Sequence, residues 1–180
     1  LSPSVVIKRN SEIVREGGVR EIRFETTDTK SLETSIPFFK GNNLDYSEIL
    51  PFSDPGVKKI VGVTIFIMMT VVVVMLLSNG VNLTDGVDGL ASGSSAIVGV
   101  VLGVFAYVSS HHDMAGYLNT MFIPGAEELV IFAATLVGAT AGFLWYNSYP
   151  AQVFMGDTGS LALGGIIGVF AILIRKELLL

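Results

Sequence analysis

The chain has 180 residues, of which 51% are hydrophobic and 15% charged, and its formal net charge is −5. Because a soluble domain carries about a quarter charged residues, this composition and a mean hydropathy of +0.64 indicate a membrane protein. The absence of cysteine excludes a disulfide scaffold and thiolate metal sites. We expect the chain to lie in a lipid bilayer and to bind no nucleic acid.

The first 57 residues are mostly polar, and nine of the eleven Lys and Arg residues lie within the first 59 positions. Apolar residues alternate on both sides of Gly17-Gly18, a pair that suits a two-residue primed turn, so residues 11–24 predict a β-hairpin. Residues 1–7 resemble the end of a preceding helix, and residues 36–39 predict an interfacial anchor. Residues 1–57 are therefore expected to hold a helix end and a small hairpin insertion.

The region 58–180 contains four apolar segments, of 17 to 21 residues each. A helix needs about 20 residues, range roughly 17–25, to cross the hydrocarbon core of a bilayer. The strands of a membrane barrel would alternate over about 10 residues, and these segments show no alternation. We expect an all-α polytopic membrane protein with about four transmembrane helices of a larger bundle, at 60–77, 90–110, 129–146 and 158–174.

The ends of the chain and its glycines add two expectations. The chain begins at Leu1 and ends on Leu178-Leu179-Leu180, which resembles the start of another apolar run, so we expect an internal fragment of a larger protein. Glycines four residues apart predict close helix packing, with a homodimer through such faces left open. These pairs are Gly99 and Gly103, Gly138 and Gly142, and Gly164 and Gly168.

Two acidic loops adjoin the apolar segments, at 82–89 (NLTDGVDG) and 147–160 (NSYPAQVFMGDTGS). Because two spans separate them, both loops are expected on one side of the membrane, with the 111–128 loop on the other. Their acids, Asp85, Asp88 and Asp157, have no Lys or Arg nearby in sequence. Carboxylates at the membrane edge are costly to desolvate, so a divalent metal ion is the simplest counter-charge.

The residues around these acids are suited to binding phosphate. Asp85 and Asp88 are three apart, and a helix would place them on one face. Gly86 and Gly89 allow close approach of the backbone to a ligand. Ser160 is expected to cap the next helix, whose N-terminus would attract an anion. The alternative is that the acids are ordinary loop residues and caps, but two such loops on one side favour Mg²⁺ and phosphate.

Residues 82–93 and 145–165 together resemble the phospho-N-acetylmuramoyl-pentapeptide transferase family. The resemblance covers about 33 residues in the two motifs and extends through most of residues 60–180. The wider superfamily of polyprenyl-phosphate sugar-1-phosphate transferases has similar loops, and residues 145–152 favour the muramoyl-pentapeptide branch. The hairpin and residues 36–39 resemble the family's extracytoplasmic insertion.

The resemblance implies transfer of phospho-MurNAc-pentapeptide from UDP-MurNAc-pentapeptide to undecaprenyl phosphate, giving lipid I and UMP, with Mg²⁺ as cofactor. It implies a bacterial inner-membrane enzyme with the acidic loops in the cytoplasm, although the basic N-terminal segment alone would favour the opposite orientation. Phe154 is expected to stack on uracil. The implied site consists of catalytic Asp157, Asp85 and Asp88, substrate-binding Asn82, Gly86, Asn147 and Phe154, and Asp157 as the metal ligand.

The chain departs from the family in two places. The family's earlier Asp pair and its His-rich loop near the C-terminus have no counterpart, so the fragment is expected to be inactive alone. His111-His112 would lie on the wrong side of the membrane to replace that loop. Two other functions remain: a transferase of GlcNAc-1-phosphate from UDP-GlcNAc to a polyprenyl phosphate, or a cation-binding transporter. A purely structural bundle would leave the paired acidic loops unexplained.

Overall fold

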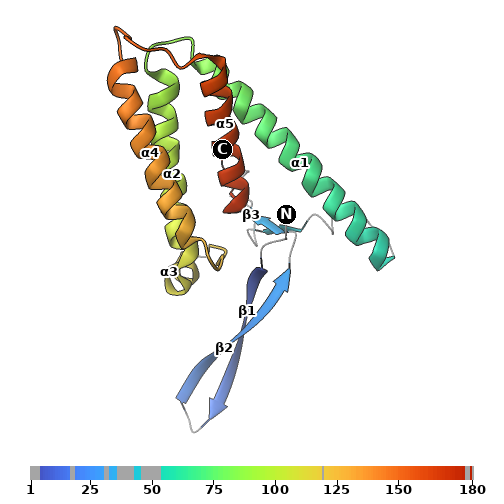
Figure 1. Cartoon of the computed structure of the whole chain (residues 1–180). Helices are drawn as coiled ribbons and strands as arrows, with labels where there is room; N and C mark the ends of the chain where they lie inside the picture. Colours follow the sequence, from blue (N-terminus) through green and yellow to red (C-terminus); the bar gives the residue numbers. More distant parts are fainter. Residues whose placement is uncertain are drawn as a thin grey trace.

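The computed structural model describes the backbone of residues 5–16, 19–30, 33–35, 43–45, 54–118, 120–176 and 179, and side chains only from Asp54 onward. Short strands precede a group of helices (Figure 1). The elements are β1 (Val5–Glu16), β2 (Val19–Lys30), β3 (Glu33–Ser35), β4 (Asn43–Asp45), α1 (Pro55–Thr84), α2 (Leu90–Ser110), α3 (His112–Tyr117), α4 (Glu127–Asn147) and α5 (Gly156–Leu173).

The strands form two antiparallel pairs. β1 pairs with β2 from Val5 opposite Lys30 to Glu16 opposite Val19, so the pairing extends well beyond residues 11–24. The prediction that residues 1–7 end a helix is wrong for residues 5–7, which begin β1. All three are β-branched, which favours a strand. β3 pairs with β4, and the predicted anchor at 36–39 lies outside the described residues.

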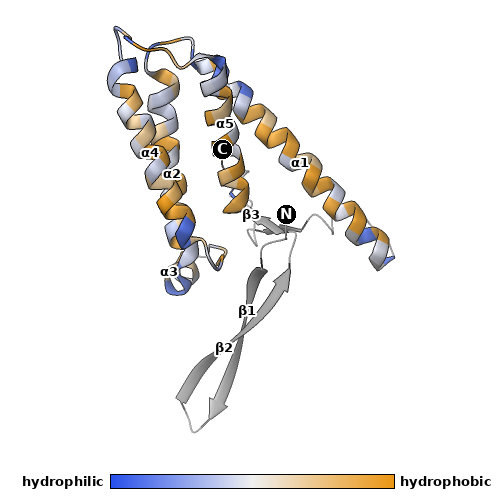
Figure 2. Ribbon diagram, in the orientation of Figure 1, coloured by the Kyte–Doolittle hydropathy of each residue, from blue (hydrophilic) through white to orange (hydrophobic). Residues whose placement is uncertain are grey.

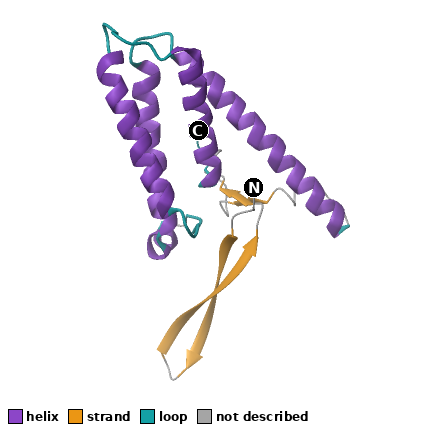
Figure 3. Cartoon of the chain, viewed as in Figure 1, coloured by secondary structure: helices purple, strands orange, loops and turns teal. Residues whose placement is uncertain are grey.

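Four helices are long and apolar enough to cross a membrane, as predicted: α1, α2, α4 and α5 (Figure 3). Three of them begin and end within two residues of the predicted spans. α1 is longer than its predicted span of 60–77. It begins earlier because the Oδ1 atom of Asp54 accepts a hydrogen bond from the Gly56 N–H (2.9 Å) and Pro55 occupies the first turn. It continues past the apolar run to Thr84. Hydropathy marks the part of a helix that lies in the membrane and does not mark where the helix ends.

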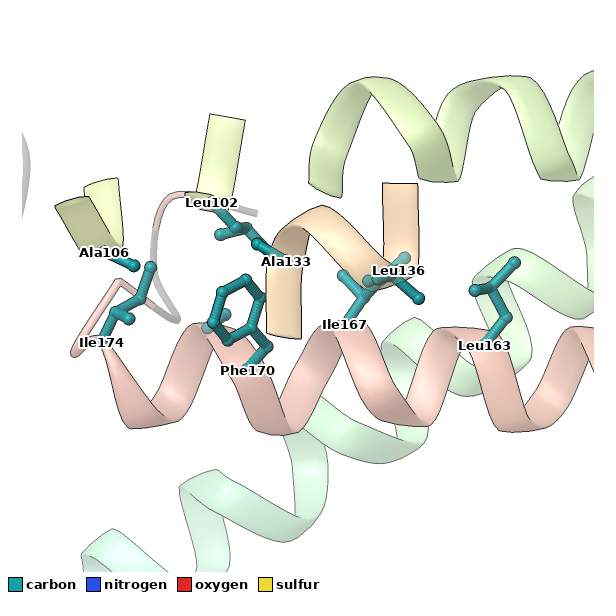
Figure 4. Close-up of a cluster of buried hydrophobic side chains, with 9 residues drawn as sticks. Leu102, Ala106, Ala133, Leu136, Leu163, Ile167, Phe170 and Ile174 are labelled. Carbon is teal, nitrogen blue, oxygen red and sulfur yellow. The ribbon is translucent and has the colours of Figure 1, made fainter. Parts of the chain in front are cut away.

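The helices pack mainly in two pairs, α2 against α4 and α1 against α5 (Figure 1). A cluster of buried side chains joins α2, α4 and α5 (Figure 4). Phe170 of α5 is at its centre, with its ring 5.7 Å from that of Phe132. The cluster consists of Leu102, Ala106, Ala133, Leu136, Leu163, Ile167, Phe170, Ala171 and Ile174.

α1 is apolar along most of the side seen in Figure 2, and its sequence has no charged residue from Ile60 to Thr84. Many of its large side chains are exposed, among them Ile60, Met68 and Leu76. A helix that is hydrophobic all round is typical of a membrane span. The exposed surface of the helices is therefore suited to contact with lipid.

Two of the three predicted glycine pairs lie at helix contacts. A Cβ atom at Gly103 would lie 3.0 Å from the Ala133 Cβ atom, and one at Gly164 would lie 2.7 Å from the Ser78 Cα atom. The prediction of close packing is confirmed for these pairs. It is wrong for Gly138 and Gly142, where a Cβ atom would meet no atom of the described chain within 4 Å.

The contact at Gly164 predicts a difference between two adjacent glycines. Gly164→Ala should lower the Tm of the chain in detergent, because its methyl group would press on the backbone of Leu77 and Ser78. Overpacking of this kind costs about 1–3 kcal/mol, more than the roughly 1 kcal/mol that Ala gains over Gly in a helix. Gly165→Ala is the control, since its Cβ atom would meet nothing within 4 Å. Equal Tm values would contradict the close contact.

The two acidic loops lie together at one end of the helices, and α3 lies at the other (Figure 1). We call the end with residues 85–89 and 148–155 the loop end. The even number of spans between the two loops predicts this arrangement, and the structure confirms it. β1 and β2 lie beyond the opposite end of the helices from these loops (Figure 1).

Candidate active site

Direct hydrogen bonds join the two loops at the loop end. The Asp88 Oδ2 atom accepts from the Ala151 N–H (3.1 Å), and the Asn147 Oδ1 atom accepts from the Gly89 N–H (3.1 Å). These residues are 63 and 58 positions apart in the chain. The structure therefore brings the two loops into direct contact.

Asp157 presents an exposed carboxylate in the first turn of α5, which begins where the second loop ends. The Asn82 Nδ2 group donates to its Oδ1 atom (3.1 Å) and also to the Ser160 Oγ atom (2.9 Å). Asn82 lies in the last turn of α1 and not in a loop as predicted. The contact between α1 and α5 therefore fixes the direction of the Asp157 carboxylate.

Ser160 does not cap α5, so that prediction is wrong. α5 begins at Gly156, and the residue before it, Met155, makes no side-chain cap. Ser160 lies one turn inside the helix and is fully buried. Its hydroxyl bonds the Gly156 carbonyl (3.1 Å), as serine inside a helix commonly does. It supports Asn82 and has no surface for a ligand.

Asp85 and Asp88 do not share a helix face, contrary to the prediction. α1 ends at Thr84, and the chain turns through residues 85–89 before α2 begins. Gly89 has φ +77°, a left-handed conformation that glycine adopts without strain. Asp88 is consequently directed at the second loop, where it binds the Ala151 N–H. Gly86 is exposed between the two acids, so its backbone is open to a ligand.

Asn147 ends α4 and is almost fully buried, with 3% of its surface exposed. Its Oδ1 atom accepts from the Ser92 Oγ–H (3.0 Å) as well as from Gly89, and its Nδ2 group donates to the Val153 carbonyl (2.9 Å). Protein groups therefore take both acceptor sites of the amide oxygen and one of its two N–H donors. Sequence reasoning missed Ser92, since nothing distinguishes it from other serines of α2 before the fold brings it to Asn147.

Phe154 lies in the second loop with 72% of its surface exposed. An aromatic ring with a free face can stack on a planar ligand. Trp145 and Tyr149 are also exposed near this end, at 80% and 87%. The ring of Phe154 is therefore accessible to a nucleobase, as its predicted role requires.

The carboxylates of the two loops offer few protein ligands for a metal ion. Among residues 54–118 and 120–176, no three Asp, Glu or His side chains are close enough to share one. Asp157 is the suitable candidate, since it is exposed and Asn82 bonds only its Oδ1 atom among the contacts described. Mg²⁺ is commonly held by one or two carboxylates together with water and substrate phosphates. The residues present fit an ion shared with a substrate and not a cage built from protein alone.

His111 and His112 lie at the far end of the helices from Asp157, as the single span between them and the first acidic loop predicts. The His111 Nδ1 atom is 2.9 Å from the Tyr107 carbonyl oxygen, and the His112 ring packs on Phe122 with centroids 5.4 Å apart. The two rings therefore have different partners. Neither can replace a histidine at the loop end.

Comparison with known proteins places these observations in a family. The model of glycosyl transferase family 4 matches residues 33–175. A relative from Porphyromonas gingivalis (strain ATCC 33277) is 64% identical over the whole chain, which covers 43% of that relative. Relatives from Parabacteroides distasonis and Bacteroides fragilis (strain ATCC 25285) are 58% and 57% identical over the whole chain, covering 43% and 42% of them. All three are named phospho-N-acetylmuramoyl-pentapeptide-transferase.

The chain thus spans less than half the length of these curated relatives. The family model covers both loops and all four membrane-capable helices. The resemblance of the two motifs to this group of transferases is confirmed. This chain belongs to glycosyl transferase family 4.

Proposed function

We propose that this chain forms part of the active site of a phospho-N-acetylmuramoyl-pentapeptide transferase. Such an enzyme would transfer phospho-MurNAc-pentapeptide from UDP-MurNAc-pentapeptide to undecaprenyl phosphate and form lipid I and UMP. One observation carries the proposal: two loops with the family's motifs are hydrogen-bonded together at one end of the membrane helices, where Asn82 also bonds the exposed carboxylate of Asp157. The names of the relatives support the choice of sugar.

The predicted site residues at the loop end have proposed roles in binding the UDP-linked substrate. Phe154 would stack on the uracil ring, and the backbone at Gly86 would lie close to the phosphates. Asp157, held by Asn82, would bind Mg²⁺, whose charge offsets that of the pyrophosphate. Asp85 and Asp88 complete the acidic rim, and Asp88 also joins the two loops.

The proposed reaction exchanges one phosphoanhydride bond for another. An oxygen of the lipid phosphate attacks the β-phosphorus of the UDP-sugar, and the bond from that phosphorus to the bridging oxygen breaks. UMP leaves with the bridging oxygen. A lipid phosphate is already ionised near neutral pH and needs little help from a general base, so we propose direct attack without a covalent enzyme intermediate.

We propose that the loop end faces the cytoplasm of a bacterial cell, because UDP-sugars are found there. The β1–β2 hairpin would then be an extracytoplasmic insertion, since it precedes a single span that leads to the loop end. A homodimer would use the face of α4 at Gly138 and Gly142, which no atom of the described chain covers within 4 Å.

A chimera tests the proposed function. In it, the 180 residues of this chain replace the segment that they match in the P. gingivalis relative. With undecaprenyl phosphate and Mg²⁺, the chimera should release UMP from UDP-MurNAc-pentapeptide and form a lipid-linked product. UMP release from UDP-GlcNAc alone would favour the sister transferase. Cation flux without release of UMP from either sugar would favour a transporter.

Phe154 provides a test of nucleotide binding in the same chimera. Phe154→Ala should weaken UMP binding, measured by calorimetry, by about tenfold, because stacking of a base on an aromatic ring contributes roughly 1–3 kcal/mol. Binding of undecaprenyl phosphate should change little. Tyr117→Ala is the control, since Tyr117 is also exposed but lies in α3 at the opposite end. Equal weakening of nucleotide and lipid binding would contradict the stacking role.

A further inference from the structure

We propose that Asn147 is a positioning residue that holds the two loops together and so sets the place of Phe154, without touching the substrate. This inference rests on the proposed function, because Phe154 matters only if a nucleotide binds. It also replaces the substrate-binding role that the family resemblance implies for Asn147.

The Asn147 amide is buried and hydrogen-bonded to groups of three other residues. A carbonyl oxygen has two acceptor sites, and the two sites of Oδ1 take the Gly89 N–H (3.1 Å) and the Ser92 Oγ–H (3.0 Å). The Nδ2 group donates to the Val153 carbonyl (2.9 Å). With 3% of its surface exposed, the residue has no face left for a ligand.

The Asn147 amide joins the backbones of the two loops. Gly89 follows Asp88 in the first loop, and Val153 precedes Phe154 in the second. Both partners are backbone groups, so the two bonds fix the main chain next to two proposed site residues. The bond from the Ala151 N–H to Asp88 joins the same loops a second time.

The second loop combines a hydrogen-bonded backbone with an exposed ring at Phe154. The Gln152 N–H also bonds the Tyr146 carbonyl (2.9 Å), which turns the second loop back onto the end of α4. The Phe154 side chain is nevertheless 72% exposed. The backbone that carries the Phe154 ring is held in place before a ligand binds. This preorganisation reduces the entropy that is lost when the loop is ordered by a ligand.

Asparagine is chemically suited to position 147. The three hydrogen bonds need an acceptor for two donors and a donor for one carbonyl on the same short side chain. Aspartate would keep the acceptor but place an oxygen against the Val153 carbonyl. The partner position Gly89 has little room for a side chain, since a Cβ atom there would lie 3.2 Å from the Leu144 Cδ1 atom.

A double-mutant cycle in the chimera separates positioning from direct contact. Ser92 is fully buried and cannot reach a ligand, but it shares the Asn147 Oδ1 atom. Asn147→Ala should weaken UMP binding about tenfold, and Ser92→Ala about threefold, as expected for loss of hydrogen bonds in one network. The double variant should bind UMP no more weakly than Asn147→Ala, since residues in one network are not additive.

Hydrogen exchange gives a second readout that does not need activity. Asn147→Ala should speed amide exchange in peptides covering 85–93 and 148–155. Asn147→Asp should speed it mainly in 148–155, because the acceptor for Gly89 remains, and this variant also serves if the alanine variant fails to fold. Ser94→Ala is the matched control, since Ser94 is exposed on α2 and bonds only within its own helix. It should change neither exchange nor UMP binding.

The outcomes distinguish this inference from the proposed function. If Asn147→Ala weakens UMP binding while Ser92→Ala and loop exchange stay unchanged, Asn147 contacts the nucleotide and the inference is overturned. Unchanged UMP binding in both variants would overturn it as well. The unsubstituted chimera could bind no UMP while amide exchange still rises in Asn147→Ala. Asn147 then holds the loops together but the proposed function is wrong, and the positioning role fails with it.

Discussion

Asp157→Asn should lower the rate of lipid I formation by the chimera by about a thousandfold. The neutral amide would lose the negative charge with which Asp157 is proposed to hold Mg²⁺. A bound metal ion contributes several kcal/mol of charge stabilisation, and each 1.36 kcal/mol corresponds to a factor of ten in rate. The substitution keeps the size of the side chain and an oxygen that can accept from Asn82. The initial rate of lipid-linked product, measured across a Mg²⁺ titration, tests this expectation.

A second acid provides the control for that experiment. Asp113 is exposed in α3, at the end of the helices opposite the loops. Asp113→Asn makes the same change of charge and should leave the rate within about twofold, since exposed charges more than a Debye length of roughly 10 Å apart are largely screened. Thermal unfolding of both variants checks folding. Near-normal turnover by Asp157→Asn would remove Asp157 from the metal site.

The sequence predicts the membrane helices well because the information is local. α2 begins at Leu90 and ends at Ser110, as predicted, since an apolar run is bounded by Gly89 and by polar residues. The start of α1 depends on the Asp54 cap, and its end at Thr84 lies beyond the apolar run. Hydropathy reports the membrane thickness that a helix crosses, so it misses helical turns outside that thickness.

The glycine pairs show a different limit. The spacing of four residues reveals a face without side chains but does not identify what packs on it. Gly164 meets the backbone of α1, whereas Gly138 meets no atom of the described chain within 4 Å. Both positions have the same sequence pattern. Only the arrangement of the helices separates them.

The composition of the site was predictable, and its internal organisation was not. Parity brings the two loops to one end, and the motifs identify the acids. The bonds from Asn82 to Asp157 and from Ser92 to Asn147 join residues 75 and 55 positions apart. Such bonds depend on how α1 packs on α5 and α2 on α4. They show that Asn82 and Asn147 hydrogen-bond other residues of the candidate site, which the motifs alone do not reveal.

Asn82→Leu should have the second largest effect on the chimera. Leucine is close to asparagine in size but removes the donor that bonds the Asp157 Oδ1 atom and the Ser160 hydroxyl. The carboxylate would keep its charge but lose its fixed direction. Loss of such an outer partner commonly costs 10–100-fold in metal affinity or activity. We expect the rate of lipid I formation to fall by about that factor, with a higher Mg²⁺ concentration needed for half-maximal rate.

The matched control for Asn82 lies one turn earlier on the same helix. Asn79 is exposed, and its Nδ2 group donates to the Met75 carbonyl within α1. Asn79→Leu makes the same chemical change without touching Asp157, so both the rate and the Mg²⁺ requirement should stay near those of the unsubstituted chimera. If Asn82→Leu lowers the rate but excess Mg²⁺ restores it fully, Asn82 acts through metal binding alone. A normal rate and a normal Mg²⁺ requirement in Asn82→Leu would show that the contact between α1 and α5 does not orient Asp157 for the reaction.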